Sequence, residues 1–302
     1  MSVSGLLLEP KRFAVHDGPG VRTTFFLKGC PLRCLWCHNP ESISPKPQTA
    51  FFEHKCLHCG ECVPVCRNGA QAVSDEKHVF FSDKCSACGS CEPVCLGKAM
   101  KLYGRRMTVG ECMAVALEDA EFYRNSGGGV TLSGGEPLMQ ADFALALLGE
   151  LKKAGISTAL DTCAFVSREV LAASLPLTDI YLVDFKHADS ETHRRLTGQP
   201  NERIRDNLRF LSDSGARIEI RIPFVPGCND SEENMRATGD FLGGLHIECV
   251  KLLPYHALAR TKYRSLHMPD TMPRVEPPTD EQIAAAVAVL RARGVPAKSG
   301  KD

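Results

Sequence analysis

Cysteine spacing constrains this chain of 302 residues more than any other feature, because eleven of its 15 cysteines fall into three short groups. The sequence has no run of about 20 apolar residues, which is the length needed to span a membrane. Residues 1–10 also lack the charged and cleavage regions of an export signal. We therefore expect a cytoplasmic protein, whose reduced cysteines hold metals or iron–sulfur clusters rather than form disulfides. The groups are Cys30, Cys34 and Cys37; Cys56, Cys59, Cys62 and Cys66; and Cys85, Cys88, Cys91 and Cys95, while Cys112, Cys163, Cys228 and Cys249 are scattered.

The second and third groups share the spacing C-x2-C-x2-C-x3-C, which is typical of bacterial ferredoxins with two four-iron clusters. In that arrangement the fourth cysteine of each group ligates the other cluster. A pair of structural zinc sites is the alternative, but zinc ribbons use paired cysteines with longer gaps. The predicted cluster ligands are Cys56, Cys59, Cys62 and Cys95 for one cluster, and Cys85, Cys88, Cys91 and Cys66 for the other.

The first group, Cys30-x3-Cys34-x2-Cys37, supplies only three thiolates. A four-iron cluster held by three thiolates keeps one iron without a protein ligand, and a substrate or cofactor can bind to that iron. The alternative is a zinc site completed by His38. The spacing favours a cluster that takes part in bond chemistry rather than one that only carries electrons.

Apolar segments of strand length alternate with helical patterns along most of the chain, which is typical of βα units around a parallel sheet. Six such units are too few for an eight-stranded barrel, so we expect an α/β fold, a partial (β/α)6 TIM-like barrel of residues 1–47 and 102–302. Residues 48–101 lack the alternation and would form an inserted bacterial-ferredoxin-like domain. The expected strands are residues 21–28, 129–133, 156–161, 179–184, 217–223 and 247–253.

Two helices have clear boundaries in the sequence. Thr108 with Glu111, and Thr279 with Gln282, fit the capping box that opens a helix. We expect these helices to run to about residues 125 and 293, before Gly127 and Gly294.

Unusual residues follow the expected strands, at the edge where barrels of this kind hold their active sites. Gly134 and Gly135 let a ligand approach the backbone closely, and Glu136 offers an acceptor for an ammonium group, although a plain turn is the alternative. Lys186 and Arg221 could hold a carboxylate, or they could simply face solvent.

Two acidic residues end neighbouring expected strands. Asp161 and Asp184 could share a cation through oxygen ligands, or they could cap the segments that follow. His256 follows the last expected strand and completes a rim of polar residues on one edge of the sheet.

Taken together, these motifs resemble the activating enzymes of glycyl radical enzymes, within the radical S-adenosylmethionine (SAM) family, and specifically the subgroup with a two-cluster ferredoxin insertion. The resemblance spans nearly the whole chain. It rests on HDGPGVR at residues 16–22, KGCPLRCLWCHNPE at 28–41, SGGEP at 133–137, LDT at 160–162, VDFK at 183–186, LPYH at 253–256, and Lys262 with Tyr263.

The resemblance implies roles for the matching residues only. The methionine part of SAM would occupy the open iron of the catalytic cluster. A departure is Cys163, which follows Asp161 and Thr162 where relatives often carry Asn, and which we interpret as a packed small residue. The implied roles are cluster ligation for Cys30, Cys34 and Cys37; binding of the methionine amino group for Gly134, Gly135 and Glu136; lining of the cofactor for Trp36, Lys186, Arg221 and His256; a monovalent-cation site for Asp161, Thr162 and Asp184; and contact with the partner's glycine peptide for Asp17.

The implied activity is reductive cleavage of SAM to methionine and a 5′-deoxyadenosyl radical, which abstracts hydrogen from a glycine of a partner enzyme. Three [4Fe-4S] clusters are implied, and the two in the insertion would feed or buffer electrons from a donor such as flavodoxin or ferredoxin, or dock the partner. The charge is balanced, with 36 Lys and Arg against 36 Asp and Glu, so nucleic acid is not the expected partner.

Two alternatives remain at this level. The chain could be a radical SAM enzyme that acts on a small molecule or another peptide, or a ferredoxin-type electron carrier. The electron carrier would need only the eight cysteines of residues 48–101 and would leave the rim residues without a role. The sequence selects neither the particular glycyl radical enzyme, nor the reductant, nor the oligomeric state.

Overall fold

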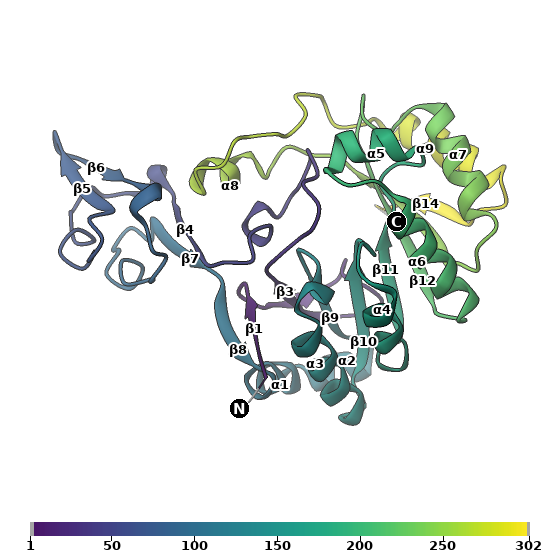
Figure 1. Cartoon of the computed structure of the whole chain (residues 1–302), viewed down its shortest axis with the longest axis horizontal. Helices are drawn as coiled ribbons and strands as arrows, with labels where there is room; N and C mark the ends of the chain where they lie inside the picture. The colour runs from purple at the N-terminus through teal and green to yellow at the C-terminus, as the bar shows by residue number, and fades with distance from the viewer. Residues whose placement is uncertain (1–2, 301–302) are drawn as a thin grey trace.

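Parallel strands form the centre of the computed structural model, which describes residues 3–300 (Figure 1). All six strands expected from the sequence are confirmed to within two residues at each end. The C-terminal strand β14 was not predicted, because three residues are too few to show a pattern. In spatial order the parallel strands are β3 (Arg22–Leu27), β9 (Gly129–Gly134), β10 (Ser157–Thr162), β11 (Ile180–Asp184), β12 (Ile218–Phe224), β13 (Cys249–Pro254) and β14 (Ala297–Ser299).

An antiparallel edge extends this sheet beyond β3, so the sheet is mixed. Strand β1 (Ser4–Leu7) pairs with β3 and with β8 (Arg105–Thr108), and β2 (Lys11–Ala14) also pairs with β3. These strands were missed because four residues show too little alternation to distinguish a strand from a loop. The fold class is therefore α/β with a central parallel sheet and an antiparallel addition.

The first capping-box helix is interrupted, which corrects the prediction of one helix to residue 125. Both capping boxes are present, but α1 (Val109–Glu118) and α2 (Ala120–Ser126) are separated at Asp119. The Asp119 carboxylate is buried and accepts hydrogen bonds from Arg12 and from the Thr23 hydroxyl, at 2.5–2.9 Å. These tertiary contacts fix the break, and a local sequence pattern does not contain them.

Most of the remaining helices cover one face of the parallel strands, with α3, α4 and α6 running along it in Figure 1, whereas α8 lies apart from them beside β4. The remaining helices are α3 (Ala141–Lys153), α4 (Arg168–Ser174), α5 (Ser190–Thr197), α6 (Glu202–Asp213), α7 (Glu232–Leu242), α8 (Arg260–Ser265) and α9 (Asp280–Arg291), with short 3-10 turns at Pro40–Ser42, Glu53–Lys55, Ser82–Lys84, Pro137–Gln140 and Leu175–Leu177.

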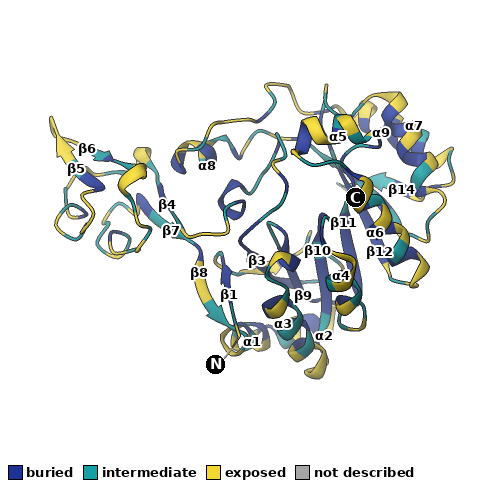
Figure 2. Ribbon diagram, viewed as in Figure 1, coloured by how far each residue is buried: buried dark blue, intermediate teal, exposed yellow. Residues whose placement is uncertain are grey.

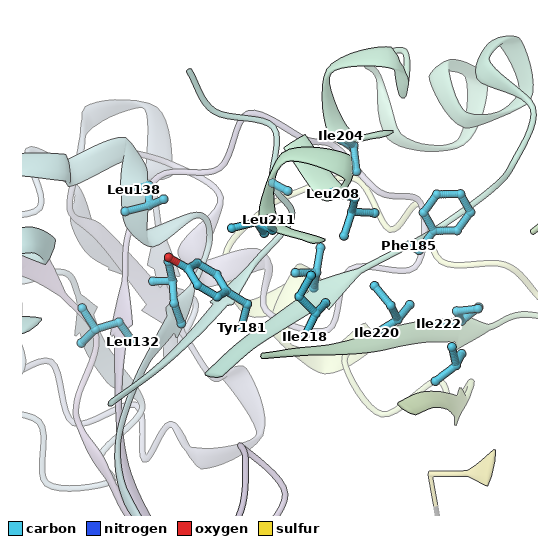
Figure 3. Close-up of a cluster of buried hydrophobic side chains, with 14 of the residues drawn as sticks. Leu132, Leu138, Tyr181, Phe185, Ile204, Leu208, Leu211, Ile218, Ile220 and Ile222 are labelled. Carbon is cyan, nitrogen blue, oxygen red and sulfur yellow. The ribbon is translucent and has the colours of Figure 1, made fainter. Parts of the chain in front are cut away.

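The main core lies between these helices and the strands, which are buried along most of their length (Figure 2). Helix α6 shows why: Ile204, Leu208 and Leu211 recur at a spacing of four and three residues, which places them on one face. They pack toward Ile218 and Ile220 of β12 (Figure 3). Within residues 3–300 no helix is both long enough and apolar enough to cross a lipid bilayer.

A separate lobe holds the second and third cysteine groups, and it projects away from the parallel sheet at the left of Figure 1, with α8 beside it. We call residues 48–103 the cysteine lobe. Its base is an antiparallel pair, β4 (Gln48–Phe51) with β7 (Met100–Tyr103), and its outer part carries the hairpin of β5 (Gln71–Ser74) and β6 (Lys77–Phe80). The lobe has its own small hydrophobic cluster, in which cysteines pack with Phe80 and Met100.

Candidate active site

A cavity of about 350 Å³ lies at the C-terminal edge of the parallel strands. This volume and position are typical of a small-molecule site in an α/β protein. Most of the residues singled out from the sequence line the cavity together, although they come from six separate segments. They are Cys30, Cys34, Trp36, Cys37, Gly134, Gly135, Asp161, Thr162, Asp184, Lys186, Arg221 and His256.

The three-cysteine loop, residues 30–37, is anchored through its backbone. The Arg33 and Leu35 N–H groups donate to carbonyls at the end of α5, at 2.6 and 3.0 Å. The Tyr263 hydroxyl donates to the Cys37 carbonyl at 3.1 Å. Trp36 is 5% exposed and packs in a small cluster with Tyr255 and Tyr263. The loop is therefore held between α5 and the segment that follows β13.

Two of the three thiols, those of Cys34 and Cys37, fit metal ligation in their chemistry as well as in their position. Burial raises the pKa of Cys34 to about 11 and that of Cys37 to about 12. Without a cation both would be neutral thiols, and a bound iron would supply the positive charge that converts them to thiolate ligands.

The glycine turn after β9 has a structural reason that the sequence did not reveal. A Cβ on Gly134 would lie 2.3 Å from the Leu27 carbonyl oxygen, and one on Gly135 would lie 2.1 Å from the Gly29 carbonyl oxygen. The Glu136 N–H also donates to that Gly29 oxygen at 2.7 Å. The turn therefore packs directly against the residues that lead into Cys30, and only glycine permits this approach.

Glu136 has different surroundings from those we expect of an ammonium acceptor. Its side chain is fully buried and does not line the cavity. The carboxylate accepts from the Thr162 hydroxyl at 2.7 Å, the Cys163 N–H at 2.9 Å, the Cys163 thiol at 3.1 Å and the Leu138 N–H at 3.1 Å. Burial raises the pKa of Glu136. In this structure Glu136 fixes the end of β10 through Thr162 and Cys163.

Two cations and two carboxylates lie close together in the lining of the cavity. The Lys186 ammonium donates to Asp184 at 2.6 Å. The Arg221 guanidinium donates to Glu219 at 3.1 Å and lies 3.9 Å from Asp161. Burial opposes the charge on Lys186, but Asp184 outweighs it and holds the pKa of this lysine above its usual range.

Asp161 is the most perturbed carboxyl of this group. Burial raises its pKa to about 6, against the attraction of Arg221, and the nearby charge of Asp184 raises it further. The Ser133 hydroxyl donates to the Asp161 carboxylate at 2.6 Å. Asp161 and Asp184 end adjacent parallel strands, so the cavity wall carries two acidic groups whose repulsion a bound cation would relieve.

Asp161→Asn should change the pH dependence of stability of the metal-free chain. Because its pKa is about 6, Asp161 keeps a proton in the folded chain between about pH 4 and pH 6, where an exposed aspartate has lost it. The free energy of unfolding should therefore fall as pH rises through this interval, by on the order of 2 kcal/mol more in the wild type than in the variant. Urea unfolding across the interval measures the difference, and equal slopes would contradict the prediction.

Asp17 does not line the cavity, but its loop adjoins it. The Asp17 carboxylate accepts from the Thr24 hydroxyl at 2.8 Å, and its carbonyl accepts from the Thr131 hydroxyl at 2.6 Å. Arg221 donates to the neighbouring His16 carbonyl at 2.9 Å. A cavity residue therefore contacts the loop directly.

His38 lines the cavity, whereas the sequence suggested it only as a zinc ligand. Its ring lies 4.1 Å from that of His256, and its Nε2 is 2.9 Å from the His256 carbonyl oxygen. Burial lowers the pKa of His38 to about 4, so the ring is neutral at physiological pH. Its closeness to the rim could have been inferred only from the fold, because His38 and His256 are far apart in sequence.

The eight cysteines of the lobe surround two further small cavities, four to each. We call these sets the Cys56 quartet and the Cys85 quartet. Each quartet takes its fourth cysteine from the other half of the lobe, as the ferredoxin spacing predicts. The members are Cys56, Cys59, Cys62 and Cys95 in the first, and Cys66, Cys85, Cys88 and Cys91 in the second.

Backbone N–H groups point at sulfur in both quartets. His58 and Ala99 donate to cysteines of the Cys56 quartet at 3.4 and 3.1 Å, and Ala87 and Ala70 donate to cysteines of the Cys85 quartet at 3.4 and 3.2 Å. Such bonds to ligand sulfur are one means by which proteins tune iron–sulfur clusters. Among residues 3–300, no three His, Cys, Asp or Glu side chains converge closely enough to hold a single metal ion.

Comparison with known proteins assigns the family. Residues 24–238 match the model of the radical SAM superfamily. The choline trimethylamine-lyase activating enzyme of Oleidesulfovibrio alaskensis is 41% identical over 86% of both chains. The trans-4-hydroxy-L-proline dehydratase activating enzyme of Clostridioides difficile is 38% identical over 98% of this chain and 99% of its own.

A solved structure agrees with these relatives. A domain of a pyruvate-formate lyase-activating enzyme from Bacteroides vulgatus superposes with a TM-score of 0.50 at 30% identity, over 57% of this chain and 99% of that domain. The family match over residues 24–238 contains the cavity residues from Cys30 to Arg221. The chain therefore belongs to the radical SAM superfamily and, within it, to the activating enzymes of glycyl radical enzymes.

Proposed function

We propose that this activating enzyme binds SAM in the cavity beside the three-cysteine loop and removes a hydrogen atom from a glycine of a partner enzyme. The observation that carries the proposal is the shared cavity: three thiols, the glycine turn, and the buried cations Lys186 and Arg221 all line it. A ferredoxin-type carrier needs no such cavity.

Cys30, Cys34 and Cys37 would hold the catalytic [4Fe-4S] cluster. When bound, that cluster supplies the electron that cleaves SAM to methionine and a 5′-deoxyadenosyl radical. The backbone of Gly134 and Gly135 borders the place where the amino acid part of SAM would lie. Together with the other cavity residues, it would orient SAM beside the three-cysteine loop.

The charged residues of the cavity would hold the carboxylate of SAM and a monovalent cation. Lys186 and Arg221 are each only 6% exposed, so their charges act in a site from which water is largely excluded. A cation held by Asp161, Thr162 and Asp184 would offset the effect of burial and, to a smaller extent, the repulsion by Asp184 that raise the pKa of Asp161. Trp36 and His256 would complete the cofactor's walls.

We assign a further [4Fe-4S] cluster to each quartet of the cysteine lobe, which makes residues 48–101 an inserted ferredoxin-like domain. The crossed sharing of cysteines and the N–H···S bonds support this assignment. A flavodoxin or ferredoxin would supply the electron.

The protein partner is a glycyl radical enzyme, and the loop of Asp17 would meet its glycine peptide. Relatives named for a choline lyase, a sulfopropanediol dehydratase, benzylsuccinate synthase and indoleacetate decarboxylase lie between 36% and 41% identity. Because these sequence identities are so similar, they do not indicate which glycyl radical enzyme this chain activates.

Anaerobic reconstitution tests the proposal. With iron and sulfide, the chain should bind about 12 iron atoms, and after reduction it should convert SAM to 5′-deoxyadenosine. Mixing with candidate glycyl radical enzymes should give the electron paramagnetic resonance doublet of a glycyl radical in one of them. Full iron content without cleavage of SAM would instead support an electron carrier.

A further inference from the structure

The cysteine lobe consists of two similar halves, residues 56–70 and 85–99. In sequence the halves align without gaps, so Leu57 corresponds to Ser86, and Arg67 to Leu96. Their backbones match as well, because unusual left-handed φ angles recur at equivalent positions. These pairs are His58 and Ala87 at 55° and 52°, Gly60 and Gly89 at 78° and 80°, and Gly69 and Lys98 at 62° and 51°.

The two quartets differ in what covers them. Leu57 and Leu96 follow cysteines of the Cys56 quartet and are 64% and 72% exposed. The corresponding residues at the Cys85 quartet are polar, Ser86 and Arg67. The fold therefore does not require apolar residues at these positions, and the exposed leucines need another reason.

The two leucines lie near each other, and a third exposed apolar residue, Val73, lies beside Gly60 at the same cavity. A Cβ on Gly97, next to Leu96, would lie 3.2 Å from Leu57, and a Cβ on Gly60 would lie 3.6 Å from Val73, which is 45% exposed. We call Leu57, Val73 and Leu96 the apical patch. It lies over the Cys56 quartet, since Leu57 and Gly60 line that cavity.

The Cys85 quartet lies closer to the base of the lobe. The Cys85 thiol is 3.4 Å from the Thr49 hydroxyl of β4. A Cβ on Gly89 would lie 2.9 Å from Leu102 of β7, whereas the equivalent Gly60 meets Val73 on the outer hairpin. Strands β4 and β7 join the lobe to the rest of the chain.

A chain of contacts leads from the Cys85 quartet to the three-cysteine loop. The Cys66 sulfur accepts a hydrogen bond from the Ala70 N–H. The Ala70 carbonyl in turn accepts one from the N–H of Phe81, the residue that follows β6. The neighbouring Phe80 ring lies 5.3 Å from that of His267, just after α8. Helix α8 in turn contacts the Cys37 carbonyl through Tyr263.

Phe51, which lines the cavity of the Cys56 quartet, also contacts Phe80, so the base strands decide the order: Thr49 and Leu102, at the Cys85 quartet, lie nearer to the rest of the chain than Phe51 and Met100, at the Cys56 quartet. The Cys56 quartet is therefore the outer one and the Cys85 quartet the inner one.

We propose that the apical patch is the docking site of a one-electron carrier protein, and that electrons enter at the Cys56 quartet and pass through the Cys85 quartet to the three-cysteine loop. The inference rests on the proposed function, which places a cluster at each quartet. For each SAM cleaved, the carrier loses one electron and leaves in its one-electron-oxidised form.

The surface fits such a carrier in size and charge. Complexes between electron carriers are small and transient, so a patch of three side chains centred on a redox site is sufficient. On the Val73 side of the patch the exposed charged residues Glu61 and Asp75 are acidic, whereas the two leucines are flanked by exposed lysines, Lys55 and Lys98. A carrier with acidic residues around its cofactor would complement them.

The test gives the outer quartet a polar, uncharged surface. Leu57→Ser with Leu96→Gln removes both apolar side chains without adding charge, and the same backbone already carries polar residues at the equivalent positions, so the lobe should fold and keep its iron. Stopped-flow absorbance would follow reduction of the clusters by reduced flavodoxin and, separately, by titanium(III) citrate. Arg67→Ala, at the inner quartet, is the matched control.

We expect the second-order rate constant with flavodoxin to fall at least tenfold in the double variant, whereas the rate with titanium(III) citrate and the iron content stay unchanged. Arg67→Ala should change neither rate. An unchanged flavodoxin rate overturns the proposal, and so does an equal slowing with both reductants, because that would show altered clusters rather than lost docking.

A single turnover by pre-reduced enzyme separates the donor from the glycyl radical enzyme as occupant of the patch. The double variant should give the wild-type yield of glycyl radical, because no donor is needed. A lower yield with an unchanged flavodoxin rate would show that the partner enzyme docks here. Failure of the proposed function itself would be visible in the wild type, as missing iron or missing 5′-deoxyadenosine.

Discussion

Cys34→Ala will abolish formation of 5′-deoxyadenosine and lower the bound iron from about 12 to about 8 atoms per chain. Cys34 lines the cavity between the other two thiols of its loop, and two thiolates cannot hold a four-iron cluster that needs three. The lobe quartets lie outside this cavity, so their iron should remain. Iron analysis and chromatography of the nucleoside products measure both effects.

Cys249→Ser provides the control for the loss of a thiol. Cys249 is half-buried at the start of β13 and belongs to none of the three groups. This variant should keep full iron content and full cleavage of SAM. If Cys34→Ala retained about 12 iron atoms, the three-cysteine loop would not be the site of a cluster.

The sequence predicted the parallel strands because each is an apolar run between turn residues, and burial on both faces of a sheet demands such runs. The antiparallel strands β1, β2 and β8 were missed because each has only four residues. The break at Asp119 could not be read from helical periodicity, because it depends on Arg12 and Thr23, about 100 residues away in sequence.

The composition of the cavity was predictable for a simple geometric reason: the ends of parallel strands meet at one edge of a sheet. Asp161, Asp184 and Arg221 could therefore be grouped without coordinates. The direction in which a side chain points could not be predicted in this way. Glu136 turns into the protein, where Thr162 at the end of β10 and Cys163 just after it offer donors.

Lys262 was recognised only as part of a motif, and the structure now gives it a specific contact. Its ammonium donates to the Glu41 carboxylate at 2.6 Å, to the His38 carbonyl at 2.9 Å and to the Asn39 side chain at 3.2 Å. These residues directly follow Cys37. Helix α8 therefore holds the end of the three-cysteine loop through one side chain.

Lys262→Met should destabilise the metal-free chain by about 1–3 kcal/mol, because it leaves the Glu41 carboxylate without its counterion. The Glu41 side chain is 8% exposed, and among the described residues its Oε2 already lacks a hydrogen-bond partner. Lys262 is 34% exposed, so we expect less than the full cost of breaking a buried pair. Urea unfolding followed through Trp36, the only tryptophan, measures the change next to the loop.

The variant should also lose iron from the catalytic site faster than from the lobe, since the loop next to Cys37 loses its anchor. Adding Glu41→Gln should restore at least half of the lost stability, because the buried group is then a neutral amide. Lys153→Met breaks a comparable ion pair with Glu150, but on the surface, where the side chains are 75% and 48% exposed, and should change stability by less than about 0.5 kcal/mol. Equal effects of the two lysine variants would mean that burial of Glu41 does not anchor the loop.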